Sequence, residues 1–303
     1  MPQAPLSVVT GAFGFSGKYI AAGLLAAGER VRTLTNRAGG EGAGIEVAPI
    51  NFADPRQLAK SLEGATTLYN TYWVRFPRGQ DTHERAVINT RTLIRAAEQA
   101  GVRRIVQISV SNPSLDSPLS YFRGKAELEE AVRGSRLSYA ILRPALIFGD
   151  EDILINNIAC LLRRFPLFAI PGRGDYRLQP IFVEDLAALA VDAGHRAENL
   201  IIDAVGPEIF TYNELVRLIA RTVGSRARIV HLSPGVVLGL SRLLGWLVND
   251  VLLTREEIQG LMDDLLVSQQ PPNASTRLSA WLAEHAGTVG ARYAHELKRH
   301  YGK

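Results

Sequence analysis

The amino-acid sequence predicts an α/β protein: a doubly wound parallel sheet with a smaller, mostly helical C-terminal lobe. Three observations lead to this class. Short β-branched runs alternate with amphipathic helical stretches, a glycine-rich turn follows the first of these runs, and the rhythm changes after Gly149. Strands separated by helices at such spacing indicate parallel βαβ units with right-handed crossovers.

The expected strands are short, rich in β-branched residues and bounded by turn residues. They are Leu6–Thr10, Val31–Thr35, Ile45–Ile50, Thr66–Thr71, Arg104–Ser109, Ser138–Leu142 and Leu200–Asp203. The expected helices between them are Gly14–Ala27, Pro55–Leu62, Asp81–Ala100, Tyr121–Gly134 and Val183–Ala193. Asp54 caps the second of these helices with proline at its first position, and Gly101 closes the third.

The change of rhythm after Gly149 divides the chain into two parts. We expect residues 1–150 to form the core of the sheet, completed by about residues 180–204, and residues 151–303 to form mainly a substrate-binding lobe. In the lobe, Asp152–Arg164 and Tyr212–Val223 read as helices, and Pro166–Pro180 reads as loop-rich.

Composition excludes several function classes. The 303 residues include 34 basic and 30 acidic ones, without a basic run interleaved with aromatics, which argues against nucleic acid. Cys160 is the only cysteine, so no disulfide framework is expected and a cytoplasmic location is favoured. No stretch of about 20 apolar residues predicts a membrane span. The nearest, Gly235–Leu253, reads as lobe packing or as a surface helix that meets lipid or a quinone.

A strand that runs into a glycine turn and a helix opens the chain: Val8-Val9-Thr10-Gly11-Ala12-Phe13-Gly14-Phe15-Ser16-Gly17. Gly11 permits the tight turn, Gly14 lets the backbone approach a pyrophosphate, and Gly17 lets the helix pack closely on the strand. The N–H groups of the helix N-terminus, with Phe13 and Phe15 beside them, then face the phosphates. Between a strand and a helix, this turn predicts a Rossmann dinucleotide site rather than a turn without a ligand.

The end of the second strand bears on which dinucleotide binds. An NAD site expects an acidic residue about 20 residues past the turn, but Asn36 and Arg37 stand there, with no carboxylate before Glu41. A guanidinium can bind a 2′-phosphate, so NADP is the favoured cofactor, with NAD as the alternative. If Arg37 has no role in binding, it is an ordinary solvent-exposed loop residue.

Two further strand ends should line the cofactor. Asn51 and Phe52 follow the third strand, where an adenine ring would lie, although Phe52 equally suits the core. Asn70, Thr71 and Tyr72 end the fourth strand and should face the ribose.

Tyr121 and Lys125 lie four residues apart, on one face of a helix that looks into the crevice at the carboxyl end of a central strand. A nearby ammonium stabilises the phenolate and lowers the phenol pKa from about 10. Tyr121 could then exchange a proton with a substrate oxygen held by Ser111, or alternatively Ser109, while nicotinamide carries a hydride. If the pair is not catalytic, Tyr121 and Lys125 simply lie on a half-exposed helix face.

His295 and His300 are five residues apart, so they do not share a helix face and no metal site is expected.

With these motifs, the chain resembles the extended and atypical short-chain dehydrogenase/reductases (NAD-dependent epimerase/dehydratase-like), and more narrowly the branch related to the accessory NADPH-binding subunit of respiratory complex I. The segments that carry the resemblance are Thr10–Lys18, Arg104–Ser111, Tyr121–Glu130, Leu142–Gly149 and Gln179–Leu186. The resemblance implies an NAD(P) cofactor and a C-terminal lobe that selects a small-molecule substrate. It also implies that Arg37 contacts the 2′-phosphate, that Pro144 lies near the nicotinamide and that Tyr121 and Lys125 form the active pair.

Two departures bear on the substrate. Only nine residues separate Ser111 from Tyr121, and Tyr72-Trp73 is bulkier than the small residues usual there; both argue against a nucleotide sugar. Three hypotheses follow: an NAD(P)-dependent oxidoreductase for a small carbonyl or hydroxyl compound, a non-catalytic NADP(H)-binding regulatory or assembly protein, and a sugar-nucleotide epimerase or dehydratase. Helices that flank such sheets often form dimers, so a homodimer is the expected protein partner.

Overall fold

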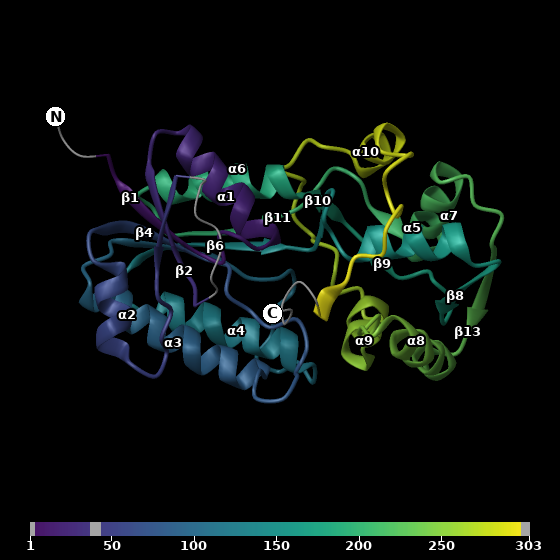
Figure 1. The fold of residues 1–303 in the computed structure, drawn as a ribbon, viewed down its shortest axis with the longest axis horizontal. Helices are drawn as coiled ribbons and strands as arrows, with labels where there is room; N and C mark the ends of the chain where they lie inside the picture. The colour runs from purple at the N-terminus through teal and green to yellow at the C-terminus, as the bar shows by residue number, and fades with distance from the viewer. Residues whose placement is uncertain (1–3, 37–43, 298–303) are drawn as a thin grey trace. The chain divides into compact units, whose positions relative to one another are not determined.

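A seven-stranded sheet forms the first of two structural units in the computed structural model, which describes residues 4–36 and 44–297. The strand order is β11-β6-β5-β4-β1-β2-β3, and all neighbours are parallel (Figure 1). The strands are β1 (Leu6–Thr10), β2 (Arg30–Leu34), β3 (Ile45–Ala48), β4 (Ala65–Asn70), β5 (Arg104–Ile108), β6 (Ser138–Pro144) and β11 (Leu200–Ala204). The predicted α/β class with a doubly wound parallel sheet is confirmed.

Helices cover both faces of this sheet. Two of them pack on each other on one face and three on the other (Figure 1). The first pair is α1 (Phe15–Ala26) and α6 (Val183–His195); the other three are α2 (Pro55–Leu62), α3 (His83–Gln99) and α4 (Ser120–Arg133). The strand order runs outward from β1 to β3 in one direction and from β4 to β6 in the other. The reversal between β1 and β4 is where such sheets bind ligands, at the carboxyl ends of the strands.

Side-chain caps determine where two of the helices begin. The Asp54 carboxylate accepts hydrogen bonds from the backbone N–H groups of Arg56 and Gln57, which starts α2 as the sequence predicts. Thr82 caps α3 by accepting from the N–H of Arg85, so this helix begins after Thr82 rather than at Asp81. The expected start was therefore two residues early.

Each unit has its own apolar core. In the first unit, the cluster joins side chains of β1, β4 and β5 to those of α2 and α3, among them Val8, Leu68, Leu93 and Ile105. In the second unit, the cluster centres on α5 and α7, with Ile155, Leu162, Leu215 and Ile219 among its members. Burial of these side chains is the main term that stabilises each unit.

The second unit, residues 145–182 and 205–303, is built from strand pairs and helices. The strand pairs are β7 (Leu146–Phe148) with β10 (Pro180–Phe182), β8 (Leu167–Pro171) with β13 (Arg228–Leu232), and β9 (Arg177–Leu178) with β12 (Phe210–Thr211). The helices are α5 (Leu154–Arg164), α7 (Tyr212–Thr222), α8 (Pro234–Val248), α9 (Arg255–Met262) and α10 (Leu278–Glu284). The segment 166–180, expected to be loop-rich, thus contains β8 and β9, whose partners come from distant parts of the chain. No helix of the described residues is long and apolar enough to cross a membrane.

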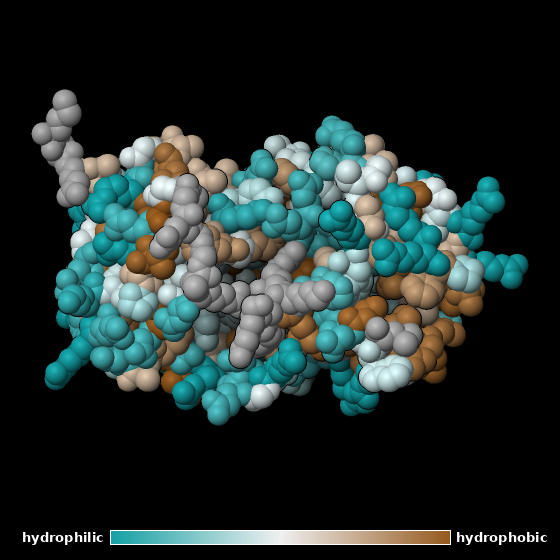
Figure 2. Space-filling model, in the orientation of Figure 1, coloured by the Kyte–Doolittle hydropathy of each residue, from teal (hydrophilic) through white to brown (hydrophobic). Residues whose placement is uncertain are grey.

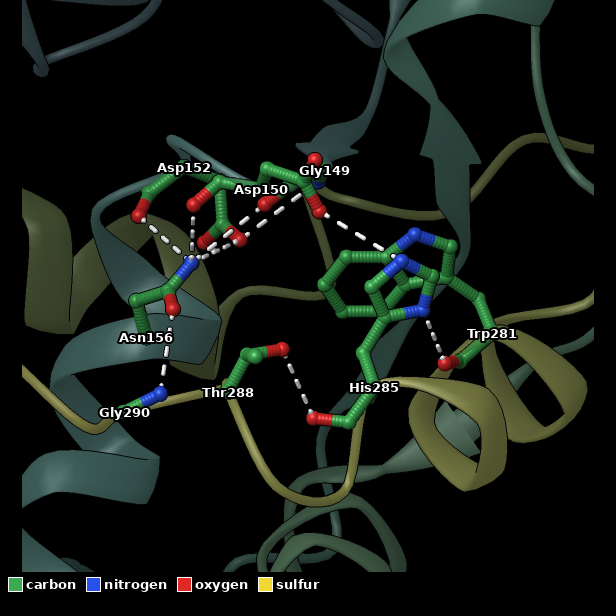
Figure 3. A network of polar contacts seen from close by, with 8 residues as sticks. All are labelled: Gly149, Asp150, Asp152, Asn156, Trp281, His285, Thr288 and Gly290. Atoms are coloured by element: carbon green, nitrogen blue, oxygen red, sulfur yellow. Dashed lines mark hydrogen bonds and ion pairs between the residues drawn. The ribbon is translucent and has the colours of Figure 1, made fainter.

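A polar network holds the C-terminal segment of the second unit against the loop that follows β7 (Figure 3). The buried Asp152 accepts a hydrogen bond from Asn156 Nδ2 at 3.0 Å, and burial raises the pKa of this carboxyl to about 7. Asn156 Oδ1 accepts from the N–H of Gly290 at 3.1 Å, and His285 Nε2 lies 3.6 Å from Asp150 Oδ1. The last two contacts join segments more than a hundred residues apart, so we interpret the network as structural.

Candidate functional site

The glycine turn between β1 and α1 is shaped by its backbone. Gly11 has φ of +69°, in the left-handed region that favours glycine, and its carbonyl accepts a hydrogen bond from the N–H of Gly14 at 2.8 Å. A Cβ atom at Gly17 would lie 2.1 Å from the Gly11 carbonyl oxygen. The helix therefore packs on the turn as closely as the sequence motif predicts.

The N-terminus of α1 is suited to an anion. The helix begins after Gly14, no described side chain caps it, and its first turn carries no acidic residue. The Thr33 hydroxyl on β2 accepts from the N–H of Ala12 at 3.2 Å and donates to the carbonyl of Val9 at 3.0 Å, which steadies the turn. Backbone N–H groups and the helix dipole thus favour a phosphate at this point.

The aromatic residues of the turn lie near its surface. Phe13 is exposed, and the Phe15 ring makes an edge contact with Tyr19 at 6.3 Å between centroids. Neither side chain is buried, so both can face a ligand bound at the turn.

One side chain links the end of β2 to the end of β3. Asn36 donates to the carbonyl of Ile50 and accepts from its N–H, so this amide joins the two strand ends. Asn51, which follows, accepts from the N–H of Ala53 at 3.1 Å and forms part of the next turn. Arg37, the predicted 2′-phosphate contact, lies outside the described residues.

The end of β4 is bonded to the end of β1. Asn70 is fully buried; it accepts from the Thr10 hydroxyl at 2.9 Å and donates to Gln107 on β5 at 2.8 Å. The Thr71 hydroxyl donates to the carbonyl of Thr10 at 2.5 Å. The side chain of Asn70 is therefore occupied within the sheet, and Thr71 is anchored where the strand order reverses.

Tyr72 and Phe52 form a small aromatic contact beside this edge. Their ring centroids are 5.1 Å apart, and the Tyr72 hydroxyl accepts from Asn89 Nδ2 at 2.9 Å. Burial raises the pKa of Tyr72, which makes it a poor proton donor. Phe52 also packs on the apolar core, which is one of the two roles that the sequence allowed for it; its contact with an adenine ring stays a prediction.

The predicted pair on α4 lies in an aromatic cluster that we call the α4 cluster: Trp73, His83, Tyr121 and Lys125. The Trp73 indole stacks on His83 with ring planes 2° apart, and Tyr121 meets the edge of Trp73 at 5.7 Å between centroids. The Lys125 ammonium lies 4.6 Å from the centre of the indole. A Cβ atom at Gly124 would be 2.8 Å from Trp73, so only glycine admits the indole here. The structure brings Tyr121 and Lys125 together around one indole.

Lys125 is a buried cation. It is 3% exposed, and Nζ donates to the carbonyl of Ile108, the last residue of β5, at 2.9 Å. Burial lowers the pKa of Lys125 to about 7, against the attraction of the Glu129 carboxylate, which raises it. The Lys125 amine is thus held at the carboxyl edge of the sheet, where burial favours its neutral form and Glu129 favours its charged form.

Behind Lys125 lies an ion pair that the sequence did not predict, between the buried carboxylate of Glu129 and the partly exposed guanidinium of Arg143. Glu129, one helical turn beyond Lys125, accepts from Arg143 Nη2 at 2.5 Å and from the Ser109 hydroxyl at 2.5 Å. The hydrogen bond to Glu129 raises the pKa of the Arg143 guanidinium. The spacing of four from Lys125 was a sequence signal for Glu129, but nothing in the sequence pairs Glu129 with Arg143 on β6.

The two predicted serines have different surroundings. The hydroxyl of Ser109 is directed to Glu129, whereas Ser111 is fully buried and its N–H donates to the carbonyl of Pro144 at 2.9 Å. Pro144 ends β6, so Ser111 and Pro144 lie together at the carboxyl ends of neighbouring strands. Within the described residues, no group of three His, Cys, Asp or Glu side chains could hold a metal ion.

Known proteins resemble this chain in sequence. Residues 11–156 match the family described as NAD(P)H-binding. The chain is 27% identical to "NADH dehydrogenase [ubiquinone] 1 alpha subcomplex subunit 9, mitochondrial" of Arabidopsis thaliana, over 87% of this chain and 71% of that protein. It is 28% identical to "Sterol demethylase protein B" of Methylococcus capsulatus, over 78% of this chain and 80% of that protein.

A solved structure extends the likeness to the fold. The NADPH-dependent quinone oxidoreductase QOR2 of Escherichia coli, crystallised with NADPH, superposes with a TM-score of 0.74 and 21% identity, over 92% of this chain and 99% of that chain. At this identity the likeness shows the fold alone. The family match and the relatives confirm the family resemblance drawn from the sequence, and the family match confirms a cofactor of the NAD(P) type.

Proposed function

We propose that this chain, whose residues 11–156 match the family described as NAD(P)H-binding, is an NAD(P)-dependent oxidoreductase of the short-chain dehydrogenase/reductase type. A hydride passes to or from a small carbonyl or hydroxyl compound, and Tyr121 exchanges the matching proton with the substrate oxygen. The observation that carries this proposal is the buried ammonium of Lys125, one helical turn from Tyr121 at the carboxyl end of β5.

The carboxyl edge of the sheet fits a dinucleotide. The close approach at Gly17 and the uncapped N-terminus of α1 leave backbone N–H groups for a pyrophosphate, and reduced nicotinamide supplies the hydride when it is bound. We assign Arg37 to the 2′-phosphate, which makes NADP the preferred form. Asn36 and Asn51 hold the strand ends on which the adenosine half would rest.

Three side chains near Tyr121 have separate roles in the proposed reaction. Lys125, as a cation, stabilises the Tyr121 phenolate and lowers the barrier to proton exchange. We assign the substrate oxygen to Ser111, because this residue lies beside Pro144 at the carboxyl ends of neighbouring strands, whereas the Ser109 hydroxyl faces Glu129. Glu129 is a positioning residue: its carboxylate favours the charged form of Lys125.

One observation supports a second candidate, a protein that binds NADP(H) without turnover. The Trp73 indole lies over the Lys125 ammonium and against Tyr121, and so occupies space beside the reacting pair. The similarity to the Arabidopsis subunit, over 87% of this chain, supports a role in an assembly. The bulk of Trp73 also argues against the sugar-nucleotide reaction, which needs room for a large substrate.

The proposed setting follows from the composition. A single buried cysteine, Cys160, suits a reducing compartment such as the cytoplasm. The proposed partners are a small-molecule substrate and a second copy of the chain, and chromatography of the purified protein measures the second of these.

The test combines cofactor binding with turnover in a Tyr121→Phe variant. We expect the wild-type protein to bind NADPH more tightly than NADH and to oxidise NADPH in the presence of 1,4-naphthoquinone or benzaldehyde. The variant should keep its cofactor affinity and melting temperature but lose turnover by about a hundredfold or more. Equal turnover by the variant would remove Tyr121 from the reaction. Tight NADPH binding without oxidation of any carbonyl probe would favour the non-catalytic candidate, and preference for NADH would overturn the Arg37 assignment.

A further inference from the structure

Helix α8 of the second unit exposes an apolar face. Val236, Leu240, Leu243 and Trp246 follow at spacings of four, three and three residues, so they lie along one side of the helix. All four are exposed, Leu243 by 58% and Trp246 by 79%. In Figure 2, apolar side chains gather over the place that α8 takes in Figure 1.

The opposite face of α8 is already packed. Val237 and Leu238 are buried, a Cβ atom at Gly245 would lie 2.5 Å from the carbonyl oxygen of Asp250, and the helix packs on β8. The helix therefore cannot turn its apolar face inward without losing these contacts. An exposed row of this kind, with a tryptophan among aliphatic side chains, indicates a surface that binds something.

The chain segment that contains α8 is rich in arginine. Between Glu214 and Glu256 the chain has six arginines (Arg217, Arg221, Arg226, Arg228, Arg242 and Arg255) and one acidic residue. That acid, Asp250, is buried and accepts hydrogen bonds from the N–H groups of Glu296 and Leu297. None of the six arginines forms an ion pair with a described carboxylate. The charge that this segment presents outward is positive throughout.

A second exposed patch of the same character lies on the strand pair next to α8. Phe165 and Leu167 are exposed at the start of β8, directly after Arg164. Arg228 on β13 pairs with Leu167, and its N–H donates to the carbonyl of Pro166 at 2.8 Å. Apolar and basic side chains thus recur together on the elements that pack with α8.

We propose that the exposed face of α8 docks on the surface of an anionic phospholipid bilayer. Leu and Val side chains would enter the acyl boundary, Trp246 would rest at the level of the head groups, and the arginines would meet lipid phosphates. A second copy of the chain is a poorer occupant, because a symmetric contact on this face would set one arginine-rich segment against another. This surface is independent of the reaction proposed above.

The test is sedimentation of the intact protein with vesicles, one set of pure phosphatidylcholine and one with about 30% phosphatidylglycerol. We expect binding to the anionic vesicles, weakened at least about tenfold by Leu243→Asp and by Trp246→Ala, and weakened also by about 0.5 M NaCl. Ile88→Asp on α3 is the matched control, since Ile88 is a comparably exposed aliphatic residue (54%) in the first unit; it should bind as the wild type does.

Tryptophan fluorescence and the melting temperature of the variant complete the test. The emission of Trp246 should shift to the blue on vesicle binding, and Trp246→Ala should abolish the shift, because Trp281 is buried and Trp73 stacks on His83. A melting temperature close to that of the wild type shows that Leu243→Asp still folds. Absence of wild-type binding to anionic vesicles, or equal binding by Leu243→Asp, overturns the proposal. So does a wild-type dimer that Leu243→Asp dissociates without any vesicle binding, which would identify a second copy as the occupant.

Discussion

The glycine turn and the α4 cluster lie at the carboxyl ends of the same parallel sheet, but they are built in opposite ways. The shape of the turn is determined mainly by its backbone: it depends on a left-handed Gly11 and on the missing side chain of Gly17. The cluster is made of side chains, with the Trp73 indole between His83 and the helix that carries Lys125. A binding surface of backbone tolerates no added atom, whereas a cluster of side chains can change its chemistry while the fold persists.

The largest expected effect comes from a substitution in the glycine turn. Gly17→Ala places a methyl group 2.1 Å from the backbone oxygen of Gly11, and backbone cannot move aside as a flexible side chain can. We expect the free energy of unfolding to fall by more than about 3 kcal/mol and NADPH affinity to fall at least about a thousandfold, as measured by urea titration and fluorescence titration.

Gly23→Ala is the control for this substitution. Gly23 lies on the same helix, and its added Cβ would meet only the side chain of Val191, at 3.2 Å. This variant should bind NADPH as the wild type does, because alanine also favours the helix. If both variants bind equally well, the turn does not depend on the close approach at Gly17.

The same contrast explains how much of the site could be predicted. Strand β1 was predicted at Leu6–Thr10, where it lies, and the turn followed, because glycines at fixed spacing between a buried strand and a helix are what a tight, closely packed turn requires. The sequence also indicated the Tyr121 and Lys125 pair, since spacing along one helix determines which residues share a face.

The partners of that pair could not be predicted. Trp73 reaches α4 from the end of β4, and Arg143 reaches Glu129 from β6, so both contacts depend on the three-dimensional packing of distant segments. The short strands β8 and β9 were missed for the same reason: few residues carry their pattern, and their partners are remote in sequence. Local periodicity predicts elements, but long-range pairing of short segments leaves little local trace.

The next prediction concerns the ion pair behind the α4 cluster. Arg143→Met removes the guanidinium that is bonded to the buried Glu129 carboxylate, so the free energy of unfolding should fall by about 3 kcal/mol in urea titrations. Turnover should also fall, because Glu129 then lies in an altered position relative to Lys125. Arg133→Met is the control: the Arg133–Glu130 pair is exposed, and its loss should leave stability nearly unchanged. Equal losses in the two variants would mean that burial does not distinguish these pairs.

The smallest expected effect is a dependence of stability on pH. Lys125 has a pKa of about 7 in the folded protein, while in the unfolded chain it should have its ordinary value of about 10.4. Between these values the unfolded state binds more protons, so this residue makes stability rise with pH above about 7 and contributes no further change below it. The rise should amount to about 2 kcal/mol from pH 7 to pH 9.

Lys125→Met isolates this contribution, because methionine fills similar space without a titrating group. The difference in unfolding free energy between wild type and variant, measured at intervals from pH 6 to about pH 9, cancels the titration of other residues. We expect the variant to gain stability relative to the wild type at pH 6 and to lose that advantage as the pH rises. A difference that stays constant with pH would mean that the folded protein holds Lys125 fully charged. In that case neither the α4 cluster nor the glycine turn would make the free energy of unfolding depend on pH in this range, and the two would differ only in composition.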